Sequence, residues 1–162
     1  MPNWCMNTLT VEHDDPTKLQ EFVDAYNSGS TCEHYLPVPK NEQGEIITDQ
    51  DSPLYWYTWC IDNWGTKWDF GLEEYGEPAK VEDNKVVVSF NSAWGPPVGL
   101  YDALYDLNYN VDATYFEAGM GFCGFYRDNQ DHYIEYSDHD EIPHTIWETY
   151  GLAQFFEEEE EV

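Results

Sequence analysis

The fold begins with a stretch of alternating side chains, Asn3-Trp4-Cys5-Met6-Asn7-Thr8-Leu9-Thr10-Val11-Glu12. Every second side chain from Cys5 to Val11 points one way and the side chains between them point the other way, which is the periodicity of a β-strand. Asp15 and Pro16 then predict a helix, because Asp is a favoured N-cap and Pro is favoured at the first helical position. The apolar face of that helix consists of Leu19, Phe22, Val23 and Tyr26.

Further along the chain, the stretch Lys85–Asn91 is β-branched and nearly continuous, which is typical of a central strand. Helix and strand patterns also occur on both sides of it. The other expected elements are a short helix over 54–63, a strand over 67–75, a second main helix after Trp94-Gly95-Pro96-Pro97, a strand over 110–117, a hairpin joining 121–127 to 132–136 across 128–131, and a last short helix around Ile146, Trp147 and Tyr150.

The order β-α-β-β-α-β is that of the ferredoxin-like split motif. The predicted fold class is therefore α+β: an antiparallel sheet with two helices on one face, an inserted aromatic segment at about 33–66 and an extra C-terminal hairpin. The second face of the sheet would be left for a partner or for the insertion. We expect a single domain over 1–150 and an acidic tail over 151–162, whose Glu run 157–161 should fray into solvent.

The charge of the chain is strongly one-sided. The 162 residues contain 33 Asp and Glu against 6 Lys and Arg, a net charge of −27, of which −16 lies in residues 1–126 and −11 in residues 127–162. Such a chain lacks the cations needed to bind nucleic acid directly and would be repelled by an anionic membrane. Its 7 Trp, 13 Tyr and 8 Phe argue against disorder. With no leader pattern and no long apolar stretch, we expect a cytoplasmic protein.

The charge density bears on the class of partner. A compact chain of this length has a radius of gyration of about 15 Å, and hence a diameter of about 40 Å. Duplex DNA of that length carries about 23 phosphates. A charge of −27 is comparable, so a basic DNA-binding groove would attract both at long range. The alternative is that the acidity serves solubility or a salty environment, neither of which needs a partner.

Four separate segments of the chain resemble a known family. They are Met1-Pro2-Asn3-Trp4-Cys5 with Asn7; Tyr57 through Trp64-Gly65-Thr66-Lys67-Trp68; Phe90-Asn91-Ser92-Ala93-Trp94 with Pro96 and Pro97; and Tyr115, Glu117, Gly119, Gly121, Phe122, Cys123 and Gly124. Together they resemble the YubB-type family of phage and plasmid proteins, over about residues 1–126. The resemblance implies a ferredoxin-like domain without an iron–sulfur cluster and an origin on a mobile element, but no activity or catalytic residues.

Motifs for catalysis or cofactor binding give no prediction of an enzyme. The loop Asp138-His139-Asp140-Glu141, near His132 and His144, has groups that can bind a divalent cation, but it lacks a metal-site spacing, and a solvated acidic loop is the favoured interpretation. The cysteines at 5, 32, 60 and 123 contain no C-x-x-C pair and are expected to be buried free thiols. Cys123 has no identifiable base to activate it as a nucleophile. We therefore predict no catalytic residues, metal or cofactor.

The tryptophans leave two interpretations open. Trp56, Trp59, Trp64, Trp68 and Trp94 could form a stacking platform, or they could be core residues, which is the favoured interpretation. The family-motif aromatic cluster is predicted to comprise Trp4, Trp64, Lys67, Trp68 and Trp94. Lys67 could cap a helix or pair with Asp69, with anion binding a weaker alternative.

Two functional hypotheses follow. The first is a phage or mobile-element accessory protein, a DNA-mimic-like inhibitor of a host protein with a basic, nucleic-acid-binding surface; a homodimer is an additional option. The second is a small ligand- or metal-binding protein or enzyme that uses the Trp cluster or the Asp138–Glu141 loop. The predicted partner-binding acidic residues are Asp128, Asp131, Glu135, Asp138, Asp140, Glu141, Glu157, Glu158, Glu159, Glu160 and Glu161.

Overall fold

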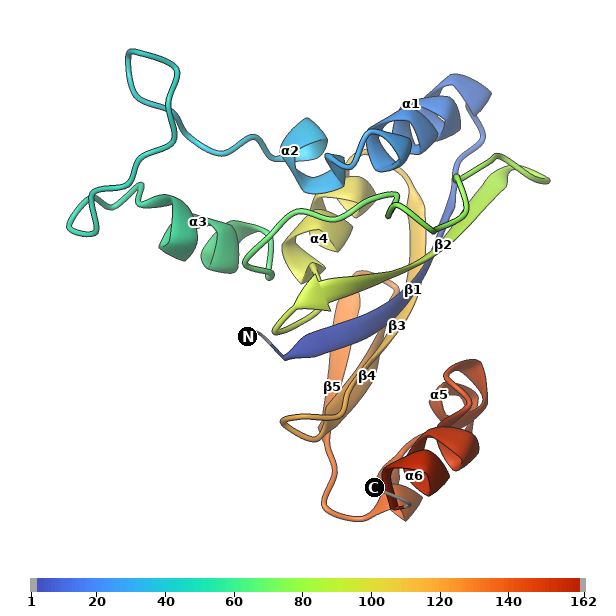
Figure 1. Ribbon diagram of the computed structural model, residues 1–162. Coiled ribbons are helices and arrows are strands. Elements are labelled where there is room, and N and C mark those ends of the chain that lie inside the picture. The colour runs from blue at the N-terminus through green and yellow to red at the C-terminus, as the bar shows by residue number, and fades with distance from the viewer. Residues whose placement is uncertain (1–2, 161–162) are drawn as a thin grey trace.

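An antiparallel five-stranded sheet organises the chain (Figure 1). This computed structural model describes residues 3–160; Met1, Pro2, Glu161 and Val162 lie outside the described residues. The strands are β1 (Trp4–Glu12), β2 (Lys85–Ala93), β3 (Asn110–Glu117), β4 (Phe122–Arg127) and β5 (Gln130–Glu135), in the spatial order β2-β1-β3-β4-β5. The helices are α1 (Pro16–Asn27), α2 (Thr31–Tyr35), α3 (Trp56–Asn63), α4 (Val98–Asp106), α5 (His144–Thr149) and α6 (Leu152–Glu160), with a 3₁₀ turn η1 (His139–Glu141). The fold is α+β, as predicted.

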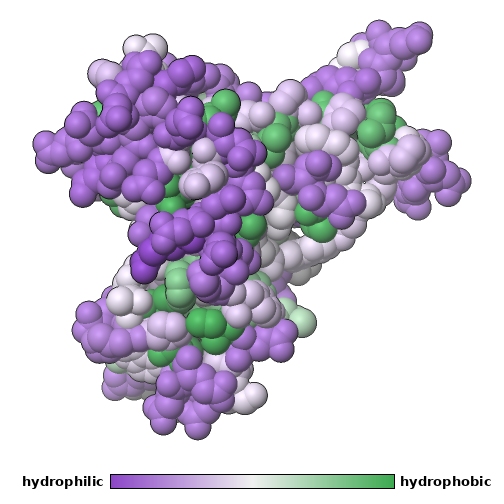
Figure 2. All heavy atoms as spheres, turned by 180° about the vertical axis from the view of Figure 1, so that it is seen from behind, coloured by the Kyte–Doolittle hydropathy of each residue, from purple (hydrophilic) through white to green (hydrophobic). Residues whose placement is uncertain are grey.

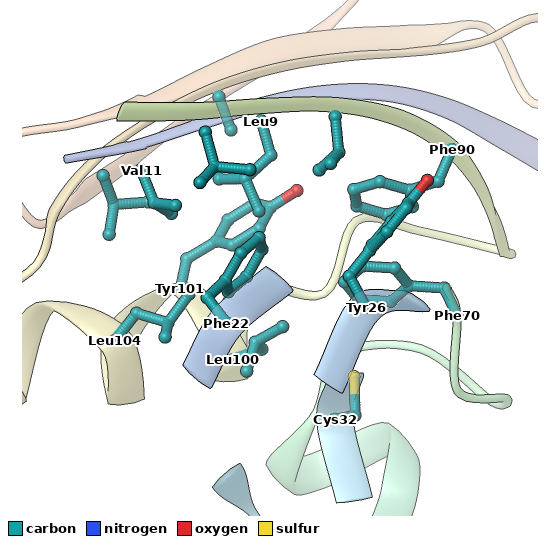
Figure 3. Close-up of a cluster of buried hydrophobic side chains, with 14 of the residues drawn as sticks. Leu9, Val11, Phe22, Tyr26, Cys32, Phe70, Phe90, Leu100, Tyr101 and Leu104 are labelled. Atoms are coloured by element: carbon teal, nitrogen blue, oxygen red, sulfur yellow. The ribbon is translucent and has the colours of Figure 1, made fainter. Parts of the chain in front are cut away.

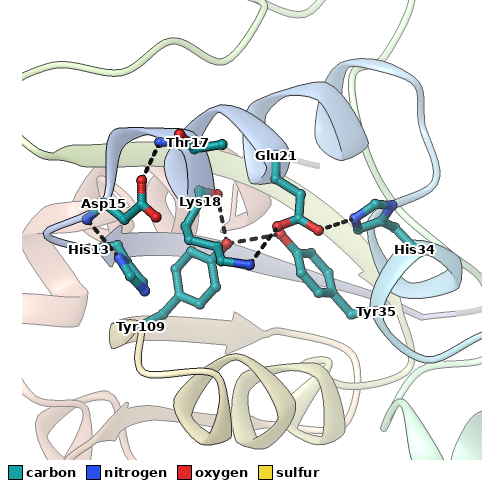
Figure 4. A network of polar contacts seen from close by, with 8 residues as sticks. All are labelled: His13, Asp15, Thr17, Lys18, Glu21, His34, Tyr35 and Tyr109. Carbon is teal, nitrogen blue, oxygen red and sulfur yellow. Dashed lines mark hydrogen bonds and ion pairs between the residues drawn. The ribbon is translucent and has the colours of Figure 1, made fainter.

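The start of α1 follows from its sequence. Asp15 Oδ1 accepts a hydrogen bond from the Thr17 N–H at 2.9 Å, and Pro16 occupies the first helical position. The Tyr109 hydroxyl donates to the carbonyl of Lys18 at 2.6 Å. Because Tyr109 directly precedes β3, this bond ties α1 to the sheet (Figure 4). The predicted helix start is confirmed.

The main core lies between the sheet and the layer of α1, α2 and α4. Leu9 and Val11 of β1 face Phe22 of α1 and Tyr101 of α4, and all four are fully buried (Figure 3). Residues 33–66, the expected insertion, pass on the same side of the sheet and bring Cys60 and Trp64 into this core (Figure 1). The insertion therefore does not cover the second face of the sheet.

The C-terminal helices cover part of that second face instead. Leu152 is fully buried, and the rings of Phe155 and Phe156 lie 5.7 and 6.0 Å from the ring of Phe116 on β3. The acidic tail expected over 151–162 is helical over Leu152–Glu160, because the segment begins with an apolar helical face. The fraying expected for the Glu run 157–161 is therefore not seen in its described part. Glu157, Glu158, Glu159 and Glu160 belong to α6, and Glu161 lies outside the described residues.

Two strand predictions need correction. Residues 67–75 form no strand, so the ferredoxin-like connectivity is not confirmed. Asp69 explains part of this result, because its carboxylate accepts hydrogen bonds from the N–H groups of Cys32, Glu33 and Phe70, which pins the segment against the start of α2. The strand predicted to be central, β2, lies at an edge and alternates between buried and exposed residues.

The hairpin prediction is confirmed with a shorter turn. Asp128 and Asn129 have φ values of 54° and 61° and connect β4 to β5 directly, with Arg127 opposite Gln130. Two positive φ values in a two-residue turn are typical of type I′. Among the described residues, none of the helices has the length and apolarity required to cross a membrane.

Candidate binding surface

The four sequence segments that resemble a family come together, in their described residues, at one end of the sheet. β1 begins there, β2 and β3 end there, and the segment 64–68 packs against the end of β2. The Thr66 hydroxyl donates to the carbonyl of Ala93 at 3.1 Å, and the Trp94 N–H donates to the carbonyl of Asn3 at 2.8 Å. Residues far apart in the sequence therefore build one local structure.

Five residues of this end form what we call the aromatic surface: Trp4, Tyr57, Lys67, Trp68 and Trp94. The Lys67 Nζ lies 4.6, 5.2 and 5.4 Å from the ring centroids of Trp68, Trp94 and Tyr57. The rings of Trp4 and Trp68 are 6.1 Å apart. Cation–π attraction holds the lysine among the rings, and the outer faces of the tryptophans stay accessible, with Trp4 51%, Trp68 41% and Trp94 40% exposed.

Trp94 adopts a strained backbone conformation. Its φ is 74°, in the left-handed region that a bulky residue rarely occupies. Such a conformation costs about 1–3 kcal/mol, and it concentrates at functional sites. The cost is not offset by full burial, because 40% of the residue remains exposed. This backbone conformation places the indole beside Lys67.

Buried polar groups support the aromatic surface from below. The Asn7 Nδ2 donates to the Ser92 Oγ at 2.8 Å, and the Ser92 hydroxyl donates to the carbonyl of Gly95 at 2.6 Å. Gly65, in the segment between α3 and Lys67, has φ 89°, and a side chain there would lie 2.8 Å from the carbonyl oxygen of Pro96. These contacts fix the turns on either side of Trp94.

Glu117 anchors the end of β3. It is 1% exposed, and its two carboxylate oxygens accept hydrogen bonds from the N–H groups of Gly119 and Met120 at 2.6 and 2.7 Å. A side chain added at Gly119 would lie 2.9 Å from the Asn3 side chain and from Glu117 Oε1, so glycine leaves room for this capped turn. Sequence reasoning did not assign this role to Glu117, although a Glu followed by closely spaced glycines is compatible with a capped turn.

The predictions for the tryptophans were right only in part. Trp64 is a core residue, 4% exposed, and its Nε1–H donates to the carbonyl of Leu36 at 2.8 Å. Trp56 and Trp59 are half-buried against the same core. The core interpretation is wrong for Trp68 and Trp94, which are exposed because none of the described helices covers their outer faces. Lys67 lies over the rings, while Asp69 caps α2 instead of pairing with it.

The predicted acidic residues do not form one patch. Asp131 accepts a hydrogen bond from the Tyr115 hydroxyl on the α4 side of the sheet, and Glu135 alternates to that same side. The turn residue Asp128 lies at the tip of this hairpin. The other predicted residues of the described chain belong to the C-terminal segment on the opposite side: Asp138, Asp140, Glu141, Glu157, Glu158, Glu159 and Glu160.

The acidic side chains are almost entirely uncompensated by bases. Within the described residues, four of the six Lys and Arg form ion pairs, each with one carboxylate: Lys18–Glu21, Lys40–Glu33, Lys80–Glu82 and Arg127–Asp112. Lys67 lies among rings instead. Hydrophilic residues cover most of the face shown in Figure 2. Further carboxylates lie on α1, α4 and the loops 41–51 and 72–83, so the negative charge surrounds the molecule.

The Asp138–Glu141 loop and Cys123 do not have the arrangement of a metal or nucleophile site in the described residues. Asp138 Oδ1 accepts a hydrogen bond from the Asp140 N–H at 3.0 Å and caps η1, while the ring of His139 stacks on Phe156 at 3.7 Å. Between residues 3 and 160, no three His, Cys, Asp or Glu side chains converge as a metal site would require. The four cysteines are free and buried, as predicted, and burial raises the pKa of Cys123 to about 11, so its thiol stays protonated.

Comparisons with known proteins leave the family of the chain open. Neither the family models, nor the curated proteins, nor the solved structures contain a match to it.

Proposed function

We propose that this protein acts by protein–protein interaction, as an acidic, DNA-mimic-like inhibitor of a protein with a basic, nucleic-acid-binding surface. The observation that carries the proposal is the uncompensated charge: the chain carries −27, and between residues 3 and 160 four Lys or Arg side chains pair with carboxylates. Such a body attracts a basic groove at long range, and salt screens this attraction.

The aromatic surface supplies the short-range part of the interaction. Exposed tryptophans are common anchors in protein interfaces. Basic nucleic-acid-binding surfaces are rich in arginine, whose planar guanidinium stacks on aromatic rings. Trp4 and Trp68 offer such faces, 51% and 41% exposed, on a chain whose net charge of −27 favours a cation over a phosphate at long range. Lys67, 4.6 Å from the Trp68 ring centroid, leaves the outer face of that ring for a partner side chain. Charge would thus increase the rate of encounter, and the rings would slow dissociation.

The biological setting of the proposal comes from the sequence. The resemblance to the YubB-type family favours a phage or mobile-element accessory protein that acts in the host cytoplasm. It also favours a ferredoxin-like classification of the domain. An inhibitor of a host defence nuclease or of another DNA-binding protein fits that setting. Because the carboxylates surround the molecule, the proposal requires general electrostatic competition with DNA, and does not require two rows of carboxylates spaced like phosphates.

The test is displacement of DNA from defined proteins. DNA-binding proteins that the chain captures from a bacterial lysate at low salt are purified, each is loaded with a fluorescent duplex, and displacement of the duplex is measured by anisotropy. We expect displacement by the wild type that weakens steeply with salt. Trp68→Ala should weaken it about tenfold, the loss typical of an interface anchor. Tyr75→Ala, which removes a ring that is 93% exposed and outside the aromatic surface, should not.

The outcome that contradicts the proposal is clear in this assay. If none of the captured proteins loses its duplex when the chain is added in excess at low salt, inhibition by competition with nucleic acid is wrong. If displacement occurs and both Trp68→Ala and Tyr75→Ala act like the wild type, the acidic surface alone carries the function.

A second candidate function is stacking of a small neutral ring, such as a sugar, on the aromatic surface. The exposure of Trp4, Trp68 and Trp94 favours it, since each ring could bury apolar area against a ligand. A thermal-shift panel of neutral sugars and nucleosides, read against Trp68→Ala, tests it; a panel without any shift would exclude this function.

A further inference from the structure

The outer edge of β2 is an open strand edge. Every second residue of an edge strand turns its N–H and C=O away from the sheet. In β2 these are the odd-numbered residues, because Lys85 exchanges both of its backbone hydrogen bonds with Glu82, outside the sheet. The N–H and C=O groups of the even-numbered residues point toward β1. Trp94, just past the end of the strand, follows this pattern, because its N–H donates to the Asn3 carbonyl.

Only some of these outward groups have a partner. The Tyr26 hydroxyl donates to the carbonyl of Ser89 at 3.3 Å, and the Thr66 hydroxyl donates to the carbonyl of Ala93 at 3.1 Å. Within the part of the chain that the structure describes, the outward N–H and C=O of Val87 and Asn91 and the N–H of Ser89 make no protein hydrogen bond. Residues 87–91 therefore present a short row of free donors and acceptors, and Val87 is 52% exposed.

Two hollows flank this row, one on each side of the sheet. The α1-side hollow, about 390 Å³, lies between Tyr26, Val88 and the loop 76–82. The α5-side hollow, also about 390 Å³, is lined by Thr8, Asn91 and Tyr150. Successive side chains of a β-strand point to opposite faces. An added strand would therefore place its side chains alternately in the two hollows, with its backbone on the open edge.

The carboxylates along the edge determine the charge of a suitable strand. The α1-side hollow is lined by Glu73, Glu77 and Glu82 against Lys80 and Lys85, and Lys80 pairs with Glu82 at 3.0 Å. Glu73 is the carboxylate shared by both hollows, and it is exposed. A charged side chain over an open edge is a common protection against unwanted strand pairing. A second copy of this chain, with its own net charge of −27, would be repelled. An Arg or Lys on an incoming strand would instead neutralise Glu73.

We propose that the outer edge of β2, residues 87–91, binds an extended basic segment of the partner protein as an additional β-strand. This is strand addition, in which main-chain hydrogen bonds give affinity and alternating pockets give specificity. The inference rests on the proposed function for the positive charge of the partner. The segment 64–68 covers the edge at Ala93, so the added strand would end beside the aromatic surface.

The test uses a defined probe and amide hydrogen exchange. The probe is a ten-residue peptide of alternating Arg and Val, and its binding is measured in 0.3 M salt, where the Debye length is well below the roughly 10 Å at 0.1 M. In the free protein, the amides of Val87, Ser89 and Asn91 should exchange fast, while those of Val86 and Val88 are protected. With the peptide bound, all five amides should be protected.

A matched pair of variants isolates the edge. Val87→Pro removes an outward N–H without removing a bond to β1, a position where an edge strand tolerates proline. It should weaken peptide binding at least tenfold, whereas Val87→Thr, which keeps the N–H and the β-branched shape, should stay within twofold of the wild type. The same peptide with every second residue N-methylated should also bind at least tenfold more weakly.

The outcomes separate the two proposals. Absence of binding by the unmodified peptide, or binding with Ser89 and Asn91 still exchanging fast, overturns the strand addition, and the exchange measurement requires no variant to fold. If a DNA-binding protein is displaced from its duplex while those two amides remain unprotected in its complex, the proposed function stands and only the site on β2 is wrong. If no DNA-binding protein is displaced but the peptide protects the edge, the reverse holds.

Discussion

Replacing Trp94 by Gly and by Ala should give an inverted order of stability. A left-handed backbone costs an ordinary residue about 1–2 kcal/mol, because its β-carbon crowds the following carbonyl. Gly has no such cost, although in regular strands it is about 0.5–1 kcal/mol less stable than Ala. At φ 74° we therefore expect Trp94→Gly to be more stable than Trp94→Ala by about 1 kcal/mol.

Both variants lose the packing of the indole. Because the residue is 40% exposed, the loss should be about 1–2 kcal/mol, below the value for a fully buried aromatic. The measurement is urea unfolding followed by tryptophan fluorescence, together with thermal unfolding. One kcal/mol corresponds to about 2–4 °C in Tm at this size. Trp94→Asn should fall between the two, because Asn tolerates the left-handed region better than Ala.

The comparison also separates stability from function. Trp94→Gly and Trp94→Ala should be equally poor at displacing DNA, since both lack the indole, although they differ in stability. The reasoning is refuted if Trp94→Ala equals or exceeds Trp94→Gly in free energy of unfolding at an unchanged m-value, because the positive φ would then carry no cost.

Three other predictions concern the charges. Tm should rise between 20 mM and 500 mM NaCl, because salt screens the repulsion of a body carrying −27; a falling Tm in calorimetry would contradict this. Glu117→Gln should lower the free energy of unfolding in urea by about 1–3 kcal/mol, because an amide N–H₂ would face one of the N–H groups of Gly119 and Met120. An unchanged urea midpoint would show that the turn needs only one acceptor. Burial raises the pKa of Asp69, so its contribution to stability is full below the unfolded pKa and is lost as pH rises through the folded pKa. The unfolding free energy of the wild type relative to Asp69→Asn should therefore increase as pH falls from 7 toward 4, and a pH-independent difference would show that Asp69 titrates alike in both states.

Local signals in the sequence predicted those elements that depend on local chemistry. The alternation in residues 3–12, the Asp15-Pro16 start of α1 and the hairpin across 128–131 each depend on a few adjacent residues. The first two are confirmed, and the hairpin is confirmed with its turn shortened to Asp128-Asn129. The prediction that β2 is a central strand was wrong, because a β-branched run has the same sequence pattern at the edge and at the centre of a sheet. Its neighbours are set by long-range pairing, which the run itself does not encode.

The strand expected over 67–75 failed for a related reason. Gly71 lies against the end of α1, where an added side chain would come within 2.5 Å of the Tyr26 carbonyl oxygen. The N–H of Leu72 donates to that same carbonyl, and Asp69 caps α2. These bonds take the segment out of the sheet despite its aromatic, strand-like composition, so tertiary contacts override propensity.

The candidate site could be predicted in its residues but not in its exposure. Trp4, Lys67, Trp68 and Trp94 were selected by the motifs, and the structure brings them together. Whether a tryptophan is core or surface depends on what covers it, and at this end of the sheet the helices cover Trp64 only. The open edge of β2 had no signal in the sequence, because it follows from the strand order.

The charge and the fold are linked energetically. A folded chain with a net charge of −27, and with four Lys or Arg ion pairs in its described residues, carries self-repulsion in its folded state. The end of α6 adds to it, since Glu157 and Glu158 lie toward the negative pole of their helix. A basic partner would relieve this repulsion on binding, so the stability of the protein and its affinity for the partner should rise together. Acidity that served only solubility would be obtained with fewer charges, whereas a competitor for a DNA-binding groove needs a density close to that of DNA. The structural cost of the charge is therefore itself an argument for a partner.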